Sequence, residues 1–459
     1  MTGFSPDLAE IRFGCGLSPV VAPPASVVAM LEGLRAPDTM AQRFPVEGYD
    51  AFARWLTETK ALRRSGKGKK APKKALKSFR EARGDKIVEG LRWAMAAQLR
   101  WTWTETAFRE RIVAFWADHF TATGKMTLMR AAADPYVETS IRPHVAGRFA
   151  DLLVAAETSP LMLHYLDQSA SVGPDSRAAR NNEARGGLNE NLAREVMELH
   201  TLGVGGPYTQ DDVRQLAELF TGLTVNNDAE FVFRPAFAEP GTETILGKTY
   251  GGNPATLESI GQALRDLAAH PATAAHLARK LAVHFVSDTP DERLVQAMTA
   301  RFLETGGDLA QVYAAMLDHP AAWALPLVNV KPPQQFIGSA WRALAVTPER
   351  VARLKPKAIR QGFEQPLVAM GQPWMLPNGP DGWPEQDAAW VTPPGVAARL
   401  IWAVNAPPTL VKALPDPRAF VDVALGRFGT DAVRFAAAAA ESRAEAVGLV
   451  LASPAFQRR

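Results

Sequence analysis

The sequence predicts a mainly α-helical fold, a multi-helix globular array with one small β-hairpin excursion near residues 223–247. Three observations lead to this fold class. Apolar residues recur at three- and four-residue spacing over most of the chain, which is the period of a helix. Strand-like alternation is confined to one short stretch. Hydrophobic residues make up 47% of the 459 positions, enough to bury one or two substantial cores.

The helical period is clearest between residues 87 and 120. Apolar side chains with this spacing are Ile87, Leu91, Met95, Leu99, Phe108, Ile112, Phe115, Trp116 and Phe120. Comparable patterns cover residues 189–202, 210–222, 256–269, 272–286, 291–304, 309–318, 333–346, 394–405, 430–439 and 442–452. We therefore expect about a dozen helices or more.

The strand-like stretch lies near the middle of the chain. Leu223-Thr224-Val225 and Phe231-Val232-Phe233 flank Asn226-Asn227-Asp228, whose side chains favour a turn. We expect a hairpin here, joined by Thr244-Ile245-Leu246, within a connecting segment 223–249. The remainder is then a single helical unit over residues 5–458, either as one body or as an N-terminal lobe 5–222 and a C-terminal lobe 250–458.

Turn chemistry marks several joints between helices. Ser or His followed by Pro recurs at the start of predicted helices, as in His270-Pro271 and His319-Pro320. Proline suits the first helical position, and the residue before it can cap the helix, so these two histidines are read as caps. Thr209 and Asp212 have the spacing of a capping box.

Composition excludes several classes of protein. The single cysteine, Cys15, can make neither an internal disulfide nor a cysteine-based zinc site. No secretory signal and no membrane-length apolar run is visible, so we expect a soluble, cytoplasmic protein. There is no nucleotide or dinucleotide motif. The nearest approach, Gly241 to Thr249, has five residues between its glycines where a phosphate-binding loop has four.

Positive charge is concentrated in residues 60–86. Twelve Lys and Arg stand there against Glu81 and Asp85, although the whole chain carries only +3. They are Lys60, Arg63, Arg64, Lys67, Lys69, Lys70, Lys73, Lys74, Lys77, Arg80, Arg83 and Lys86. The segment either contacts nucleic acid or another acidic surface, or forms a solvated insertion with a tip at Ser65-Gly66-Lys67-Gly68.

The richest polar cluster lies in residues 189–201. On a regular helix Asn191, Arg194, Glu195 and Glu198 fall within one arc, opposite Leu192, Val196 and Leu199. Such a face can bind a divalent metal, perform acid/base chemistry, or hold an anion with Arg194. It can equally be a solvated face with i,i+4 contacts. His200 lies toward the apolar side and is read as a hydrogen-bonded core histidine, unless Asn189 beside it marks a pocket.

Three further segments carry candidate residues. Trp116 and His119 are neighbours on an otherwise apolar helix, where a buried histidine needs a partner. Asp167 follows Tyr165 at a helix end and opens the polar loop 168–188. The loop 371–394 contains Trp374 and Trp383 and is too aromatic for a simple linker.

Several short runs match one protein family in order and spacing. They are Arg12-Phe13-Gly14, Phe115-Trp116 with His119-Phe120, Tyr165-Leu166-Asp167, Asn189-Glu190-Asn191 with Ala193-Arg194-Glu195 and Glu198-Leu199-His200-Thr201-Leu202-Gly203, Tyr208-Thr209 with Asp212-Val213, and Met370-Gly371-Gln372-Pro373 with Gly382-Trp383. Through these runs the sequence resembles the domain of unknown function 1800 family of bacterial proteins. The resemblance implies one helical unit over nearly the whole chain, and no settled activity.

The resemblance directs interest to the 189–201 face, because that motif is the family's hallmark. The sequence departs from the family at two places. Many members have His-Asn where this chain has Ala117-Asp118, and many have a histidine before Asp-Pro-Gly where this chain has Ala238. If those histidines are ligands elsewhere, a metal site here has to use His119, Glu195 and Glu198, with Asp118 or His200.

Three functions are left open by the sequence. The first is a hydrolase-type or other acid/base enzyme, with Glu195 and Glu198 as catalytic groups, Arg194 orienting an anionic group and His119 or His200 relaying a proton, with or without a divalent metal. Its contacts with a small molecule would include Asn189, Asn191, Trp116, Asp167, Trp374 and Trp383. The second is a non-catalytic accessory protein that binds a protein partner through the same face and the 371–394 loop. The third is nucleic-acid binding through residues 60–86.

Overall fold

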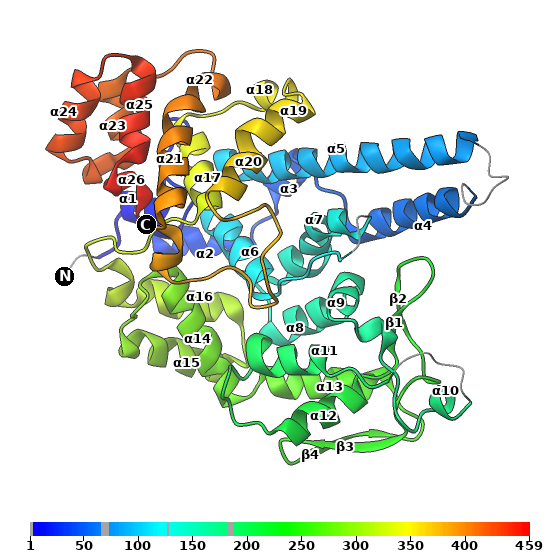
Figure 1. Cartoon of the computed structure of the whole chain (residues 1–459). Helices are drawn as coiled ribbons and strands as arrows, with labels where there is room; N and C mark the ends of the chain where they lie inside the picture. The colour runs from blue at the N-terminus through cyan, green and yellow to red at the C-terminus, as the bar shows by residue number, and fades with distance from the viewer. Residues whose placement is uncertain (1–2, 66–72, 126–127, 182–186) are drawn as a thin grey trace.

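A computed structural model describes residues 3–65, 73–125, 128–181 and 187–459 and is mainly helical, as predicted (Figure 1). The helices before the strands are α1 (Pro6–Arg12), α2 (Val27–Arg35), α3 (Thr39–Arg43), α4 (Tyr49–Ser65), α5 (Lys73–Trp103), α6 (Ala107–His119), α7 (Ala133–Tyr136), α8 (Phe149–Glu157), α9 (Pro160–Tyr165), α10 (Arg177–Arg180), α11 (Asn191–Glu195) and α12 (Gln210–Leu219). Short π-helical turns extend three segments, at Val137–Ile141, Val196–His200 and Arg360–Glu364.

The strands form two antiparallel hairpins. The predicted one pairs β1 (Leu223–Val225) with β2 (Phe231–Phe233). The prediction that Thr244-Ile245-Leu246 joins it is wrong, since β3 (Gly241–Ile245) pairs with β4 (Lys248–Gly252) as a separate sheet. Leu246 and Gly247 both have positive φ and make the tight turn between them. The stretch 241–249 that resembles a phosphate loop is therefore most of this second hairpin.

The helices after the strands include those predicted from the periodic segments between residues 256 and 452, together with several that the period did not predict. They are α13 (Leu257–Ala268), α14 (Pro271–Phe285), α15 (Glu292–Thr305), α16 (Leu309–Asp318), α17 (Pro333–Ala343), α18 (Pro348–Ala352), α19 (Pro356–Ile359), α20 (Gln365–Ala369), α21 (Pro393–Asn405), α22 (Pro407–Leu410), α23 (Pro417–Leu425), α24 (Asp431–Ala439), α25 (Arg443–Ala452) and α26 (Pro454–Gln457). The capping predictions are confirmed: His270 and His319 accept backbone N–H groups at their helix starts, and Thr209 with Asp212 forms a capping box.

Two hydrophobic cores organise these helices. The larger gathers apolar side chains from Leu8 to Leu327, including those of α6, α8 and α14. The smaller combines Leu91 to Leu99 of α5 with side chains of 336–456. The long helix α5 therefore contributes to the second core with its C-terminal half, although it lies early in the sequence. None of the helices in the described part of the chain is long and apolar enough to cross a membrane.

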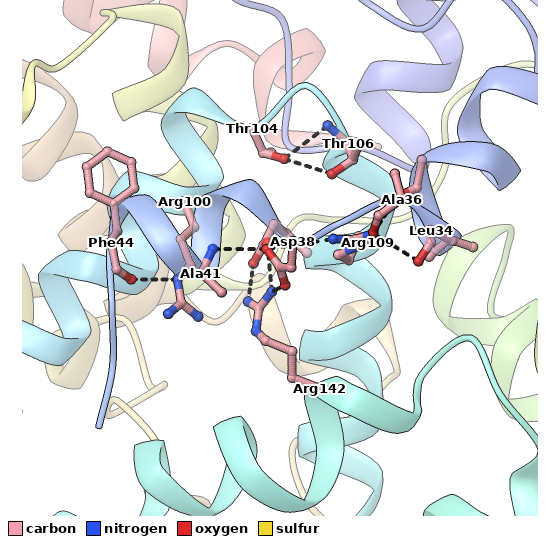
Figure 2. Close-up of polar contacts among 12 residues, drawn as sticks. Leu34, Ala36, Asp38, Ala41, Phe44, Arg100, Thr104, Thr106, Arg109 and Arg142 are labelled. Atoms are coloured by element: carbon pink, nitrogen blue, oxygen red, sulfur yellow. Dashed lines mark hydrogen bonds and ion pairs between the residues drawn. The ribbon is translucent and has the colours of Figure 1, made fainter. Parts of the chain in front are cut away.

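Buried charges tie the N-terminal helices together (Figure 2). Asp38 accepts hydrogen bonds from the Ala41 N–H and from Arg142, while Arg109 donates to the carbonyl groups of Leu34 and Ala36. Arg142 also pairs with Glu110 at 2.6 Å. Because each charge faces an opposite charge or several carbonyl oxygens, the burial of these charges is compensated within the network.

The basic segment 60–86 lies in the helical pair α4 and α5, which projects from the body of the molecule (Figure 1). Of the predicted tip 65–68, Ser65 ends α4, and residues 66–68, with Lys69 and Lys70, lie outside the described residues. Arg63, Arg64, Lys74 and Lys77 are exposed on the two helices. Lys86 is not part of this basic surface, because it is buried and paired with Glu47 and Glu89.

Candidate functional site

The 189–201 motif does not form the regular helix that its period predicts. Helix α11 ends at Glu195, and the π-helical turn Val196–His200 follows. Thr201 closes this turn by donating its hydroxyl to the Val196 carbonyl at 2.6 Å. The wider turn changes the register, so that Met197 is fully buried and Leu199 is only half-buried. Because the turn ends at His200, the Leu199 and His200 carbonyl groups have no partner within it and can accept hydrogen bonds from other elements.

Two histidines from distant helices cap these two carbonyl groups. His276 Nε2 of α14 lies 3.1 Å from the Leu199 oxygen, and His119 Nε2 of α6 lies 3.3 Å from the His200 oxygen. Burial lowers the pKa of His276 to about 4 and that of His119 well below its ordinary value. Both rings are therefore neutral at pH 7, and each donates its Nε2–H to the carbonyl.

His200 completes this cluster from within the motif. Its side chain is fully buried, as its place on the apolar side of the helix predicts. Its Nδ1 lies 2.7 Å from Oε1 of Glu157, which is also buried. The ring centroids of His119 and His200 are 5.8 Å apart, and those of His119 and His276 are 6.4 Å apart. The motif thus ends in three packed histidines, one of which lies against a buried carboxyl group.

The polar face of the motif is arranged differently from its end. Arg194 Nη2 lies 3.0 Å from Glu190, and its Nη1 lies 3.4 Å from Glu198. These are i,i+4 pairs on a half-exposed surface, and such pairs stabilise a helix only slightly. Among the described residues Glu195 forms no ion pair with Arg194. Burial raises the pKa of Glu195, and the neighbouring charges of Glu198 and Asp381 add to the rise. Among the described residues, no group of three His, Cys, Asp or Glu side chains is arranged to hold a metal ion.

Helix α14 connects the motif with a second polar region. His276, Lys280 and His284 follow one another at four-residue spacing and so share one face of this helix. The positive charge of Lys280 acts to lower the pKa of four groups. These are His119 and His276 at one end of the face and Asp118 and Glu385 at the other. Lys280 is therefore within electrostatic reach of both regions.

At the far end of that face, His284 is held between a carboxylate and a guanidinium. His284 Nδ1 lies 2.8 Å from Glu385 Oε2, and Arg459 Nη1 lies 3.3 Å from His284 Nε2. Burial lowers the pKa of His284 to about 4, against the charge of Glu385. Burial alone would raise the pKa of Glu385, but His284 and the positive charges hold it below its ordinary value. A neutral His284 thus donates Nδ1–H to an ionised Glu385, and its Nε2 accepts from Arg459.

Asp118 of α6 lies beside this pair in the opposite protonation state. Burial raises the pKa of Asp118 to about 8, and the charge of Glu385 adds to the rise. Asp118 Oδ1 accepts the Trp383 N–H at 2.9 Å. Gly382 makes this contact possible, because its φ is +77° and a Cβ there would lie 2.7 Å from the Asp118 carbonyl oxygen. At neutral pH Asp118 therefore retains its proton while Glu385 does not.

Both carboxyl groups line one pocket of about 90 Å³. Its walls come from α6, α14, the start of α17 and the loop 371–394. The polar lining residues are Asp118, Thr121, Thr123, Tyr136, His284, Gln334, Gln335, Gln372 and Glu385, and the tryptophans are Trp101, Trp383 and Trp390. Among the described lining residues there is no Lys or Arg, and none comes from the 189–201 motif.

The remaining predicted contact residues are spread over several places. Trp374 lies outside the lining and donates its Nε1–H to Asp134 at 3.2 Å, which anchors the 371–394 loop on α7. Trp116 is buried and donates to the Tyr313 hydroxyl. Asn189 donates to the Asp167 carbonyl group and accepts from the Asn191 N–H. Asn189 and Asp167 thus fix the loop before the motif helix, and Asn191 is exposed.

Sequence reasoning named Asp118 only as a reserve metal ligand and missed His284 and Glu385. The spacing of His276, Lys280 and His284 in the helical pattern 272–286 was the signal that could have found this face. Of the two positions where histidines are absent, Ala117 lines the pocket, whereas Ala238 is buried against Gly222 near the first hairpin.

Comparisons with known proteins give one match. The model of a family described as "Protein of unknown function (DUF1800)" matches residues 12–458. No curated protein and no solved structure matches the chain.

Proposed function

The chain belongs to the DUF1800 family, and from the geometry of the Asp118–Glu385 pocket we propose that it is a hydrolase-type acid/base enzyme. One observation carries the proposal. A protonated carboxyl group and an ionised one line the same small pocket, because Asp118 is desolvated while Glu385 is stabilised by His284 and nearby positive charges. Pairs of titratable groups whose pKa values are pushed apart are typical of acid/base sites.

The two carboxyl groups take complementary roles in this proposal. Asp118 donates its proton to the leaving group as the bond to it breaks. Glu385 accepts a proton from the attacking water, whose oxygen forms the new bond. Water is thus consumed, one bond is cleaved, and the two carboxyl groups exchange their protonation states until a proton returns to Asp118. His284 and Arg459 act as positioning residues, because they orient Glu385 and keep it ionised.

The lining of the pocket favours an uncharged substrate. No described lining residue is a Lys or Arg that could neutralise an anionic substrate, and Glu385 would repel one. The amides of Gln334, Gln335 and Gln372 can exchange hydrogen bonds with hydroxyl or amide groups, and the tryptophans offer flat apolar surfaces. Because the pocket is small, it holds a small molecule or one end of a larger substrate.

The motif residues support the pocket from outside in this proposal. His119 adjoins Asp118 in the chain, and His276 shares its helix face with His284, so the motif's π-helical turn fixes the spacing of α6 and α14. Glu195 interacts electrostatically with Tyr165 and Asp381, and none of the three lines the pocket. Arg194 and Glu198 neutralise each other at the surface.

The test is a screen of the full chain against uncharged chromogenic substrates, namely p-nitrophenyl glycosides, esters and anilides. For any substrate turned over, we expect Asp118→Asn and Glu385→Gln to lower kcat by about 100-fold or more. Glu198→Gln, at the surface pair, is the matched control and should retain activity. An activity that survives both pocket substitutions would contradict the proposal, and loss in Glu198→Gln alone would return the site to the motif face.

Contact with nucleic acid through the basic segment is a second candidate function. Exposed basic side chains on both α4 and α5 favour it, because these helices project from the body where a long polyanion can reach them (Figure 1).

The accessory-protein alternative rests on the exposed face of the 189–201 motif. It predicts that the pocket carboxyl groups can be replaced without loss of partner binding.

A further inference from the structure

A second cavity, of about 600 Å³, lies in the C-terminal part of the chain between α18–α20 and α21–α22. Its walls are largely apolar and include Trp341, Ile359, Phe363, Ile401, Trp402 and Leu410. Several of these side chains belong to the second core, so the inner wall of the cavity is part of that core. It shares no lining residue with the Asp118–Glu385 pocket.

Arg350 lines one edge of this cavity and begins a basic stretch of the chain. Between residues 350 and 360 the chain has five Lys and Arg and no acidic residue. Arg350, Arg353, Lys355, Lys357 and Arg360 are all exposed. We call these five residues the basic lip. Of the lip, Arg350 lines the cavity, and the other four residues are neighbours in sequence of the lining residues Leu354, Ala358 and Ile359.

The lip keeps most of its charge unpaired. Arg360 lies 3.8 Å from Glu364, which is the one ion pair found for the lip among the described residues. Arg350 is fixed at the cavity by donating from Nε and Nη2 to the Thr409 carbonyl oxygen, a neutral acceptor. The positive charge is thus available to a ligand.

The opposite edge is apolar and exposed. Ile401 lines the cavity and is 65% exposed, and Leu400 and Val404 on the same helix are also exposed. An apolar ligand that covers this exposed isoleucine removes apolar surface from water, which favours binding. The cavity volume is within the range of small-molecule sites, about 300–1,000 Å³.

We infer that this cavity binds an amphiphilic anion, with an alkyl or acyl chain in the apolar cavity and a carboxylate or phosphate head group at the basic lip. The chain replaces water against Trp341, Phe363 and Trp402, and the head group pairs with unpaired lysine and arginine charges. This ligand differs from the uncharged substrate proposed for the first pocket, and binding at one site does not depend on activity at the other.

The test uses cis-parinaric acid, a fluorescent fatty acid, titrated into the full chain. Energy transfer from Trp341 and Trp402 reports the bound probe. Ile401→Glu places a negative charge at the apolar edge, and we expect it to weaken binding at least 10-fold. Phe435→Glu is the matched control, because Phe435 is 75% exposed on α24 and does not line this cavity. Both changed side chains are exposed, so both variants should fold, which circular dichroism checks.

A second arm tests the head group. The double variant Lys355→Gln/Lys357→Gln should weaken binding of the acid several-fold but leave binding of its methyl ester unchanged. Co-sedimentation with phosphatidylglycerol vesicles separates the two sources of such a ligand: binding to vesicles without binding of the free acid identifies a membrane lipid. Absence of saturable binding in both assays, or equal affinity in Ile401→Glu and the unchanged protein, would overturn the inference.

Discussion

Asp118 shows how one side chain can hold a loop and remain available for chemistry. Its Oδ1 accepts the Trp383 N–H, while no other hydrogen bond of this carboxyl group is found among the described residues. The single backbone donor orients the group without supplying enough stabilisation to ionise it, so burial decides its pKa.

This protonation state predicts a pH dependence of stability. Because folding raises the pKa of Asp118 from about 3.8 to about 8, its contribution is fully present below pH 4 and is lost as the pH rises toward 8. In Asp118→Asn this component disappears, and we expect a smaller fall in Tm between pH 5 and pH 8 than in the unchanged protein. Differential scanning calorimetry across that range measures it, with Asp211→Asn, at an exposed position on α12, as control. An identical pH profile in Asp118→Asn would refute a raised pKa.

Gly382 is the residue at which backbone conformation and close contact coincide. Gly382→Ala adds a Cβ at positive φ, 2.7 Å from the Asp118 carbonyl oxygen, so we expect destabilisation by about 1–3 kcal/mol. Urea unfolding measures this change. Gly90→Ala in α5 is the control, because nothing lies within 4 Å of its added Cβ and alanine should stabilise that helix slightly. Equal stability in the two variants would show that the loop adjusts at 382.

At the scale of elements, the end of the motif helix explains why the motif depends on helices far away in the sequence. The last carbonyl groups of a helix have no partner within it, and those of Leu199 and His200 accept hydrogen bonds from α14 and α6. The extra residue in the turn also sets which side of the motif is buried.

This arrangement predicts acid sensitivity at the end of the motif. Since folding lowers the pKa of His276 from 6.5 to about 4, its contribution is present above pH 6.5 and is lost as the pH falls toward 4. His276→Leu removes both this dependence and the hydrogen bond to Leu199, at a cost of about 1 kcal/mol. Hydrogen exchange of the 199–203 amides, compared at pH 7 and pH 4.5, measures both effects. The control His319→Asn, which retains a helix cap, should leave the exchange of these amides unchanged. Unchanged exchange in His276→Leu would instead show that the turn does not need this hydrogen bond.

At the scale of the whole molecule, the projecting helices α4 and α5 are tested for binding to a polyanion. Removing three charges with Arg63→Ser/Arg64→Ser/Lys77→Ser should weaken binding of a fluorescent DNA duplex about 10-fold and flatten its salt dependence. Fluorescence anisotropy at several KCl concentrations measures both quantities. The control Arg293→Ser/Lys412→Ser/Arg443→Ser removes the same charge from exposed positions elsewhere. Equal losses in both variants would indicate only a nonspecific effect of net charge.

The sequence by itself determined the local features of this protein. Helical period located α12 to α17 and α21, and short-range chemistry identified the β1–β2 hairpin and the caps at Thr209, His270 and His319, because these depend on residues a few positions apart. The runs around Trp116, Asn189 and Gly382 were also sufficient to point to the family that the match over residues 12–458 then established.

Only the tertiary structure decided the rest. No local pattern predicts that Asp118 contacts Trp383, which is 265 positions away in the sequence, or that Glu385 contacts His284, which is 101 positions away. Nor could period alone reveal the π-helical turn, whose carbonyl groups need partners from α6 and α14. Protonation states follow the same rule: a carboxyl group has its ordinary pKa in the unfolded chain, and only folding places Asp118 away from water and Glu385 beside positive charge.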